Sequence, residues 1–129
     1  MKKVYLTVLL LLASTTAFAK PVLVEFFYLP HRPAEAVVAK AEQALLGMNL
    51  TVRKYSFDDS ASKNLIDKYK LHSHMPVAIF INGSDKATIN GRMVEFRNFP
   101  KGDAFVPNFE GGWTYGDLKK AAEAAGGKK

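Results

Sequence analysis

Cysteine is absent from all 129 residues of this chain. A thiolate is the nucleophile of disulfide exchange and a common ligand of zinc, so its absence excludes thiol-disulfide exchange, disulfide cross-links and thiolate metal sites. The chain also lacks an internal repeat, and its one biased tract is an alanine-rich segment near the C-terminus. Its fold must therefore be stabilised by a hydrophobic core without covalent cross-links.

The chain carries a small excess of positively charged over negatively charged residues. The 18 Lys and Arg residues outnumber the 12 Asp and Glu residues, which gives a formal net charge of +6. The basic residues are scattered along the chain, as on a solvated surface, and do not form the clusters typical of nucleic-acid binding. We therefore expect no nucleic-acid partner.

The first 19 residues have the pattern of a cleaved signal peptide. Two lysines precede residues 4–13, an apolar stretch too short to span a bilayer as a helix, and Ala17-Phe18-Ala19 forms a small-x-small cleavage site. Cleavage after Ala19 removes 19 of 129 residues and leaves 110, which suits one domain over residues 20–129. We expect an exported protein, periplasmic or secreted, with no stable membrane span after cleavage.

A strand, a tight turn and a helix N-terminus meet around residue 31. Residues 22–28 form a continuous apolar and aromatic run, which is typical of a central strand covered on both faces. Pro33 is tolerated in the first turn of a helix, and residues 36–46 are mostly good helix formers that end at Gly47. The sequence therefore predicts that His31 lies at the N-terminus of a helix.

Apolar spacing, turns and caps predict the remaining elements. Asn82-Gly83 and Asn90-Gly91 predict tight antiparallel turns, and Thr114 with Asp117 predicts a capping box. An irregular stretch separates the last strand from the last helix. The predicted order is strand 50–57, helix 61–69, strand 77–81, strand 87–89, strand 92–97, loop 98–112 and helix 115–125.

This order resembles the β-α-β-α-β-β-α core of the thioredoxin fold. The strand over residues 21–27 looks like the one that leads to the redox motif, with Glu25 matching the family's buried acid and Lys54 the lysine beside it. Met75-Pro76 is similar to the family's cis-proline loop. The resemblance implies an α/β fold with a mixed central sheet flanked by helices and an extended loop before the last helix. The chain is identified as a cysteine-less, redox-inactive, exported member of the thioredoxin-like superfamily.

The redox motif itself is replaced by His31-Arg32-Pro33-Ala34. The resemblance therefore implies the architecture without oxidoreductase activity, and we expect no catalytic residue and no enzyme, although other chemistry stays open. Glu25 and Lys54 are expected to form a buried polar pair retained by packing, with a general-base role for Glu25 as the alternative.

The resemblance points to a groove beside Pro76 that binds an exported protein or peptide. It implies that Met75 offers main-chain hydrogen bonds to an extended peptide, while an exposed Arg32 could pair with a carboxylate or phosphate. The long aromatic segment before the last helix either completes the core or forms a lid on this groove. The predicted groove residues are His31, Arg32, Pro33, His74, Met75, Pro76, Phe99, Phe105 and Trp113.

A histidine cluster supports an alternative function. His31, His72 and His74 could bind copper or zinc, since neutral imidazole is a suitable ligand for both metals. The simpler interpretation is that these side chains line the groove, and for that interpretation we expect no cofactor.

Overall fold

The computed structural model describes residues 20–71 and 74–127. The predicted signal peptide and His72 lie outside the described residues. The elements follow in the order β1 (Val22–Tyr28), α2 (Arg32–Ala44), β2 (Leu50–Ser56), α3 (Lys63–Lys68), β3 (Val77–Ile81), β4 (Lys86–Ile89), β5 (Arg92–Glu95) and α4 (Tyr115–Ala122). The protein is α/β with a mixed sheet, as the sequence predicts.

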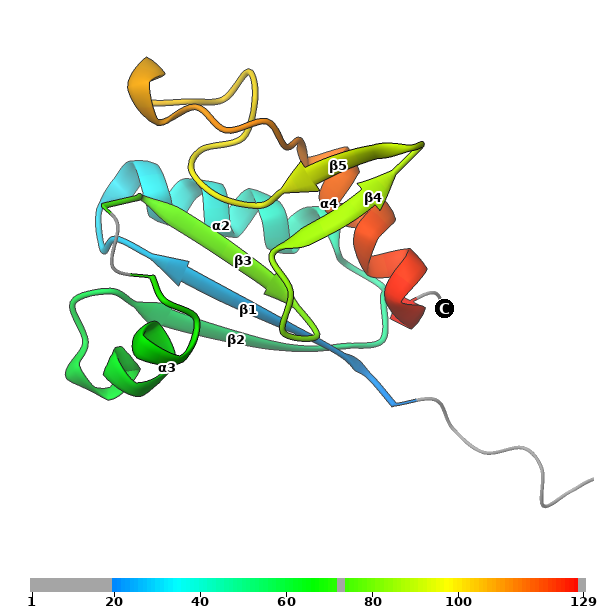
Figure 1. The fold of residues 1–129 in the computed structure, drawn as a ribbon, viewed down its shortest axis with the longest axis horizontal. Helices are drawn as coiled ribbons and strands as arrows, with labels where there is room; N and C mark the ends of the chain where they lie inside the picture. The colour runs from blue at the N-terminus through cyan, green and yellow to red at the C-terminus, as the bar shows by residue number, and fades with distance from the viewer. Residues whose placement is uncertain (1–19, 72–73, 128–129) are drawn as a thin grey trace, which may run out of the picture.

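The main sheet has three strands in the order β2-β1-β3 (Figure 1). β1 runs parallel to β2 and antiparallel to β3, so the predicted central strand lies between the other two. β4 and β5 form a separate antiparallel ribbon. Beyond β5 the chain rejoins β3, where the N–H of Ile79 donates to the carbonyl oxygen of Phe96 at 2.9 Å.

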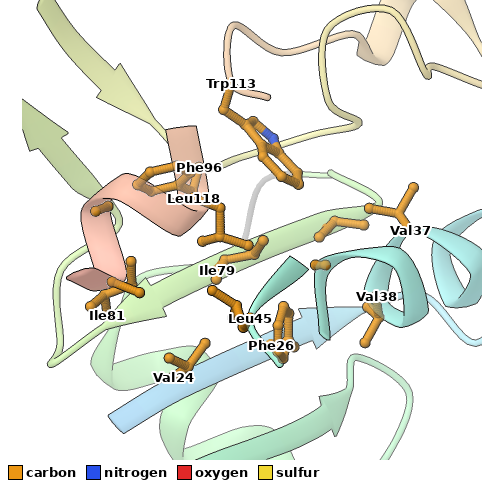
Figure 2. Packing of buried hydrophobic residues seen from close by; sticks show 14 of the residues in the cluster. Val24, Phe26, Val37, Val38, Leu45, Ile79, Ile81, Phe96, Trp113 and Leu118 are labelled. Atoms are coloured by element: carbon orange, nitrogen blue, oxygen red, sulfur yellow. The ribbon is translucent and has the colours of Figure 1, made fainter. Parts of the chain in front are cut away.

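The larger core fills the space between the main sheet and helices α2 and α4. Val24 and Phe26 of β1 face this side, because alternate residues of a strand point to opposite faces. Figure 2 shows Ile79, Leu118 and Trp113 converging on the same cluster, with Trp113 pointing into it from the preceding loop. These contacts hold α2 and α4 on one face of the sheet.

The smaller core lies on the opposite face of the main sheet. Figure 1 shows α3 beside this sheet, on the side away from α2. Phe27 is its centre, with ring contacts to Tyr55 at 5.0 Å, Tyr69 at 5.8 Å and Phe80 at 5.7 Å between centroids. Residues Leu65, Ile66 and Tyr69 pack against this cluster, which confirms the predicted inward face of the short helix.

The predicted ends of the helices are partly confirmed. At α4 the Thr114 hydroxyl accepts from the Asp117 N–H while the Asp117 carboxylate accepts from the Thr114 N–H, which is the predicted capping box. The helix ends earlier than predicted, at Ala122, and a π-helical turn follows over Glu123–Gly127. The short helix also begins later than predicted, because residues Ser60–Ser62 form a 3-10 turn capped by Asp59. No helix in the described chain combines the length and the hydropathy needed to cross a bilayer.

Candidate functional site

An apolar pocket of about 340 Å³ opens where the end of β1, the start of α2 and the loop over residues 98–112 meet. Leu29 and Ala34 lie at its β1–α2 side, and Val106 lies at its loop side. Two imidazoles are the polar side chains of a lining that is otherwise apolar. The apolar pocket is lined by Leu29, His31, Pro33, Ala34, His74, Pro76, Phe99, Phe105, Val106 and Phe109.

Six predicted groove residues line this pocket, although they come from three separate parts of the sequence. They are His31, Pro33, His74, Pro76, Phe99 and Phe105. Phe105 is 71% exposed, which is unusual for an aromatic side chain, whereas Phe99 is buried at 4% exposure. The loop therefore contributes both to the core and to the open wall of the pocket.

Arg32 lies in a neighbouring cavity, which we call the polar cleft. This cavity has a volume of about 440 Å³ and shares Pro33 and Phe105 with the apolar pocket. Lys40 and Asp103 also line it. Arg32 is exposed, as the sequence predicts, but it is the first residue of α2 and it lies beside the apolar pocket and not among its lining residues.

The prediction that Trp113 forms a wall of the groove is wrong. Its side chain is fully buried in the larger core, and its indole N–H donates to the carbonyl oxygen of Asn98 at 3.1 Å. This position removes the large ring from water and still satisfies its one donor. Met75 is also buried, at 6% exposure, in the smaller core, so its side chain does not line the pocket.

The resemblance of Met75-Pro76 to a cis-proline loop does not extend to the isomer of the peptide bond, which the sequence left open. The peptide bond between Met75 and Pro76 is trans, as are the other described peptide bonds. The trans isomer of a peptide bond before proline has the lower energy. The loop that contains Pro76 reaches the end of β1 with this bond in the trans form. The Leu29 N–H donates to the Pro76 carbonyl oxygen at 2.9 Å, which fixes Pro76 next to the end of β1.

Main-chain hydrogen bonds hold the loop wall of the pocket in place. The Phe99 N–H donates to the Phe109 oxygen at 2.9 Å, and the Gly111 N–H donates back to the Phe99 oxygen at 2.7 Å. The Glu110 carboxylate accepts from the Gly102 N–H at 2.7 Å. The two ends of the loop are thus paired across its base, and its tip reaches toward α2.

Asp103 ties the tip of the loop to both helices of the larger core. Its carboxylate accepts from the Tyr115 hydroxyl at 2.7 Å and from the Lys40 ammonium at 3.1 Å. The hydrogen bond from Tyr115 is the main cause that lowers the pKa of Asp103, with a further contribution from Lys40. Burial and the same hydrogen bond raise the pKa of Tyr115. Phe105 follows two residues later, so this cluster positions the wall that the two cavities share.

Glu25 and Lys54 do not form the predicted buried pair. Lys54 pairs in register with Phe26, which places it on the α2 face of the sheet, whereas Glu25 points to the α3 face. The Lys54 ammonium instead binds Glu42 of α2 at 3.1 Å, and its side chain is 48% exposed. The strand register therefore separates two residues that the family resemblance had placed together.

The hydrogen-bond partner of the buried Glu25 is the half-buried Tyr69, which sequence reasoning missed. Glu25 is 4% exposed, and its carboxylate accepts a 2.7 Å hydrogen bond from the Tyr69 hydroxyl. Burial, followed by this hydrogen bond and the charge of Glu25, raises the pKa of Tyr69 to about 12. The predicted inward orientation of Tyr69 was the signal that could have identified the pair.

The described part of the chain contains two of the three histidines of the alternative metal site. His31 and His74 line the same pocket, and the His74 ring meets Phe109 edge to face at 5.8 Å between centroids. Among the described residues, no group of three His, Cys, Asp or Glu side chains could hold a metal ion. The metal site stays a prediction that depends on His72, which lies outside the described residues.

Four lining residues were not among the predicted groove residues: Leu29, Ala34, Val106 and Phe109. Phe109 belongs to the aromatic segment that the sequence analysis singled out, and its spacing from Phe99 and Phe105 was the available signal. Ala34 contributes through its small size, since it stands in the first turn of α2 at the wall of the pocket.

Comparison with family models, with curated proteins and with solved structures finds no match to this chain.

Proposed function

We propose that this chain is an exported, non-catalytic domain of the thioredoxin-like type that binds a protein or peptide partner through its apolar pocket. The observation that carries the proposal is the pocket itself. Its walls come from three distant segments, and they leave apolar surface such as that of Phe105 in contact with water. Removal of apolar surface from water is favourable by about 25 cal/mol per Å² before the entropic cost of association is subtracted, so a partner that covers these walls gains part of its affinity from them.

The arrangement of the strands supports the thioredoxin-like part of the proposal. A parallel β1-α2-β2 unit followed by the antiparallel β3 is the order that the resemblance implies. Pro76 lies beside the end of β1 and lines a pocket together with the N-terminal residues of α2. The export part of the proposal rests on the signal-peptide pattern of the sequence.

The main chain of Met75 lies next to the pocket and is the proposed contact for an extended partner chain. The N–H and carbonyl of Met75 form no hydrogen bond with another described residue, and both neighbours of Met75 line the pocket. Such groups can pair with the main chain of a bound peptide, while the pocket takes one of its side chains. Binding of this kind needs no cysteine.

The composition of the pocket supports a binding role over catalysis. His31 and His74 could accept or donate protons, but within the described lining neither Ser, Thr, Asp nor Glu accompanies them. A histidine-centred hydrolase or transferase needs a nucleophile within hydrogen-bond reach of its base. The proposed role of the two imidazoles is therefore to provide polar contacts at the wall of the pocket.

Partner capture by two matched variants tests the proposal. Phe105→Ala removes an exposed wall of the pocket, whereas Leu46→Ala removes a side chain of similar exposure, 69%, that does not line the pocket. Both residues are exposed, so both variants should fold. We expect the wild-type protein and Leu46→Ala to capture the same protein from a periplasmic extract, and Phe105→Ala to lose it, as measured by mass spectrometry. Capture that Phe105→Ala retains in full would refute binding through this pocket.

A further inference from the structure

The charged residues around the apolar pocket and the polar cleft indicate which charge the partner carries, which the apolar pocket alone does not indicate. This inference rests on the proposed function, since it describes the peptide that the pocket would bind. The apolar pocket and the polar cleft are adjacent and share the side chains of Pro33 and Phe105. One partner segment can therefore reach both cavities.

Arg32 is the cation available in the polar cleft. The Lys40 ammonium is already bound to Asp103, and that carboxylate also accepts from Tyr115. The Arg32 guanidinium is exposed, and among the described residues no carboxylate forms an ion pair with it. A guanidinium presents several N–H donors in a plane that matches a carboxylate.

The start of α2 adds to the positive potential at this point. Arg32 and Pro33 are the first two residues of this 13-residue helix, and the side chain of His31 makes no capping hydrogen bond. The first N–H groups of a helix carry a partial positive charge that favours anions. The acidic residue of this first turn, Glu35, lines a different cavity together with Lys54 and forms no ion pair with Arg32.

We infer that the partner of this domain is a peptide segment in which an aromatic or branched apolar side chain lies next to an acidic residue. The apolar side chain enters the pocket between His74 and Phe105. The neighbouring carboxylate binds Arg32 in the polar cleft. Asp103 also lines the polar cleft, but its charge is countered by the Lys40 ammonium and its carboxylate accepts from Tyr115, which leaves Arg32 to bind the carboxylate of the partner.

Three synthetic peptides test this assignment on the full domain. They are acetyl-Gly-Glu-Phe-Glu-Gly-amide, its Gln-Phe-Gln counterpart and its Glu-Ala-Glu counterpart, and binding is followed by changes in the amide NMR signals. An exposed ion pair contributes up to about 1 kcal/mol, so we expect the Glu-Phe-Glu peptide to bind about 3-fold to 5-fold more tightly than the Gln-Phe-Gln peptide. Loss of the phenyl group should weaken binding further, because it empties the apolar pocket.

Two protein variants separate this inference from the proposed function. Arg32→Gln should abolish the preference for Glu-Phe-Glu, whereas Arg53→Gln, which changes an exposed arginine of β2, should keep it. Equal binding of the Glu and Gln peptides, with Phe105→Ala weakening both, would overturn the acidic partner and leave pocket binding intact. Absence of signal changes at pocket residues with about 5 mM Glu-Phe-Glu peptide would overturn both proposals. If 3-phenylpropionate bound more tightly than the peptide, the occupant would be a small amphiphilic anion and the peptide assignment would fail.

Discussion

The carboxylate of Glu25 is almost completely buried, and the Tyr69 hydroxyl binds it at 2.7 Å. The Tyr69 ring is itself fixed by stacking on Phe80 at 4.1 Å between centroids. A buried acid is costly unless hydrogen bonds replace its lost hydration, so this single hydroxyl stabilises the smaller core.

Replacement of Tyr69 by phenylalanine tests the contribution of the hydroxyl. Tyr69→Phe keeps the ring and its stacking but removes the donor to Glu25, and the free energy of unfolding should fall by about 1–3 kcal/mol. Urea denaturation measures this change. Tyr55→Phe is the matched control, because Tyr55 stacks on Phe27 in the same core and its hydroxyl binds no described residue. We expect less than about 0.5 kcal/mol for the control. Equal losses for the two variants would contradict the role assigned to Tyr69.

The raised pKa of Tyr69 predicts a dependence of stability on alkaline pH. Its pKa is about 12 in the folded protein and 10.0 ordinarily. Because the folded value is higher, the contribution of this group to stability is complete below pH 10 and is lost as the pH rises toward 12. Tyrosinate absorbance during an alkaline titration should show two late-titrating phenols in the wild type, Tyr69 and Tyr115, and only the phenol of Tyr115 in Tyr69→Phe. A wild-type titration in which every tyrosine ionises near pH 10 would contradict this expectation.

The loop over residues 98–112 is the element that makes the pocket, and its conformation depends on close main-chain contacts. Gly111 lies where a Cβ atom would be 2.2 Å from the Arg97 oxygen and 3.1 Å from the Phe99 oxygen. No side chain fits there without a shift of the backbone. The sequence predicted an irregular, turn-rich segment over these residues. It did not predict the close approach of Gly111 to Arg97, which arises because the end of the loop folds back beside the residue that precedes its start.

Alanine at position 111 should therefore disturb the pocket. Gly111→Ala should lower the free energy of unfolding by about 1–3 kcal/mol and weaken peptide binding, because the displaced backbone carries Phe109 with it. Gly112→Ala is the matched control, since a Cβ at that position meets no atom within 4 Å. Thermal denaturation and the peptide titration measure both effects. If both variants behaved like the wild type, the tight packing of the loop base would be wrong.

At the scale of the whole molecule, two cores share the strands of one sheet. β1 contributes Phe26 to the larger core and Phe27 to the smaller one, and β3 contributes Ile79 and Phe80 in the same alternating way. Loss of either core would expose one apolar face of the strands that the other core also needs. A domain of this size with shared strands should unfold in a single cooperative step.

Two local probes test this cooperativity. The indole signal of Trp113 reports on the larger core, and the methyl signals of Ile66 report on the smaller core. We expect the folded signals of both residues to disappear at the same urea concentration in NMR spectra. An earlier loss of the Ile66 signals would show that α3 and the smaller core unfold independently.

Several local features could be read from the sequence because they depend on neighbouring residues. β1 and β3 have the predicted bounds, since continuous apolar runs ended by turn residues specify buried strands. Asn82 and Asn90 adopt positive φ angles of 49° and 52°, as the Asn-Gly turns require. The candidate site was predicted less completely, because membership of its lining depends on how distant segments pack.

The absence of thiol chemistry, the order of the elements and the capping box at Thr114 follow from the amino-acid sequence alone. Composition, hydrophobic period and side-chain hydrogen bonds within one turn are local properties that do not depend on distant segments. Which side chains contact one another, and which are buried, depends on the tertiary structure. Strand register brought Tyr69 and not Lys54 to Glu25, and core packing buried Trp113 while it left Phe105 at the wall of the pocket. Those outcomes depend on the face that each element presents to the others, and this is settled when the sheet and helices pack together.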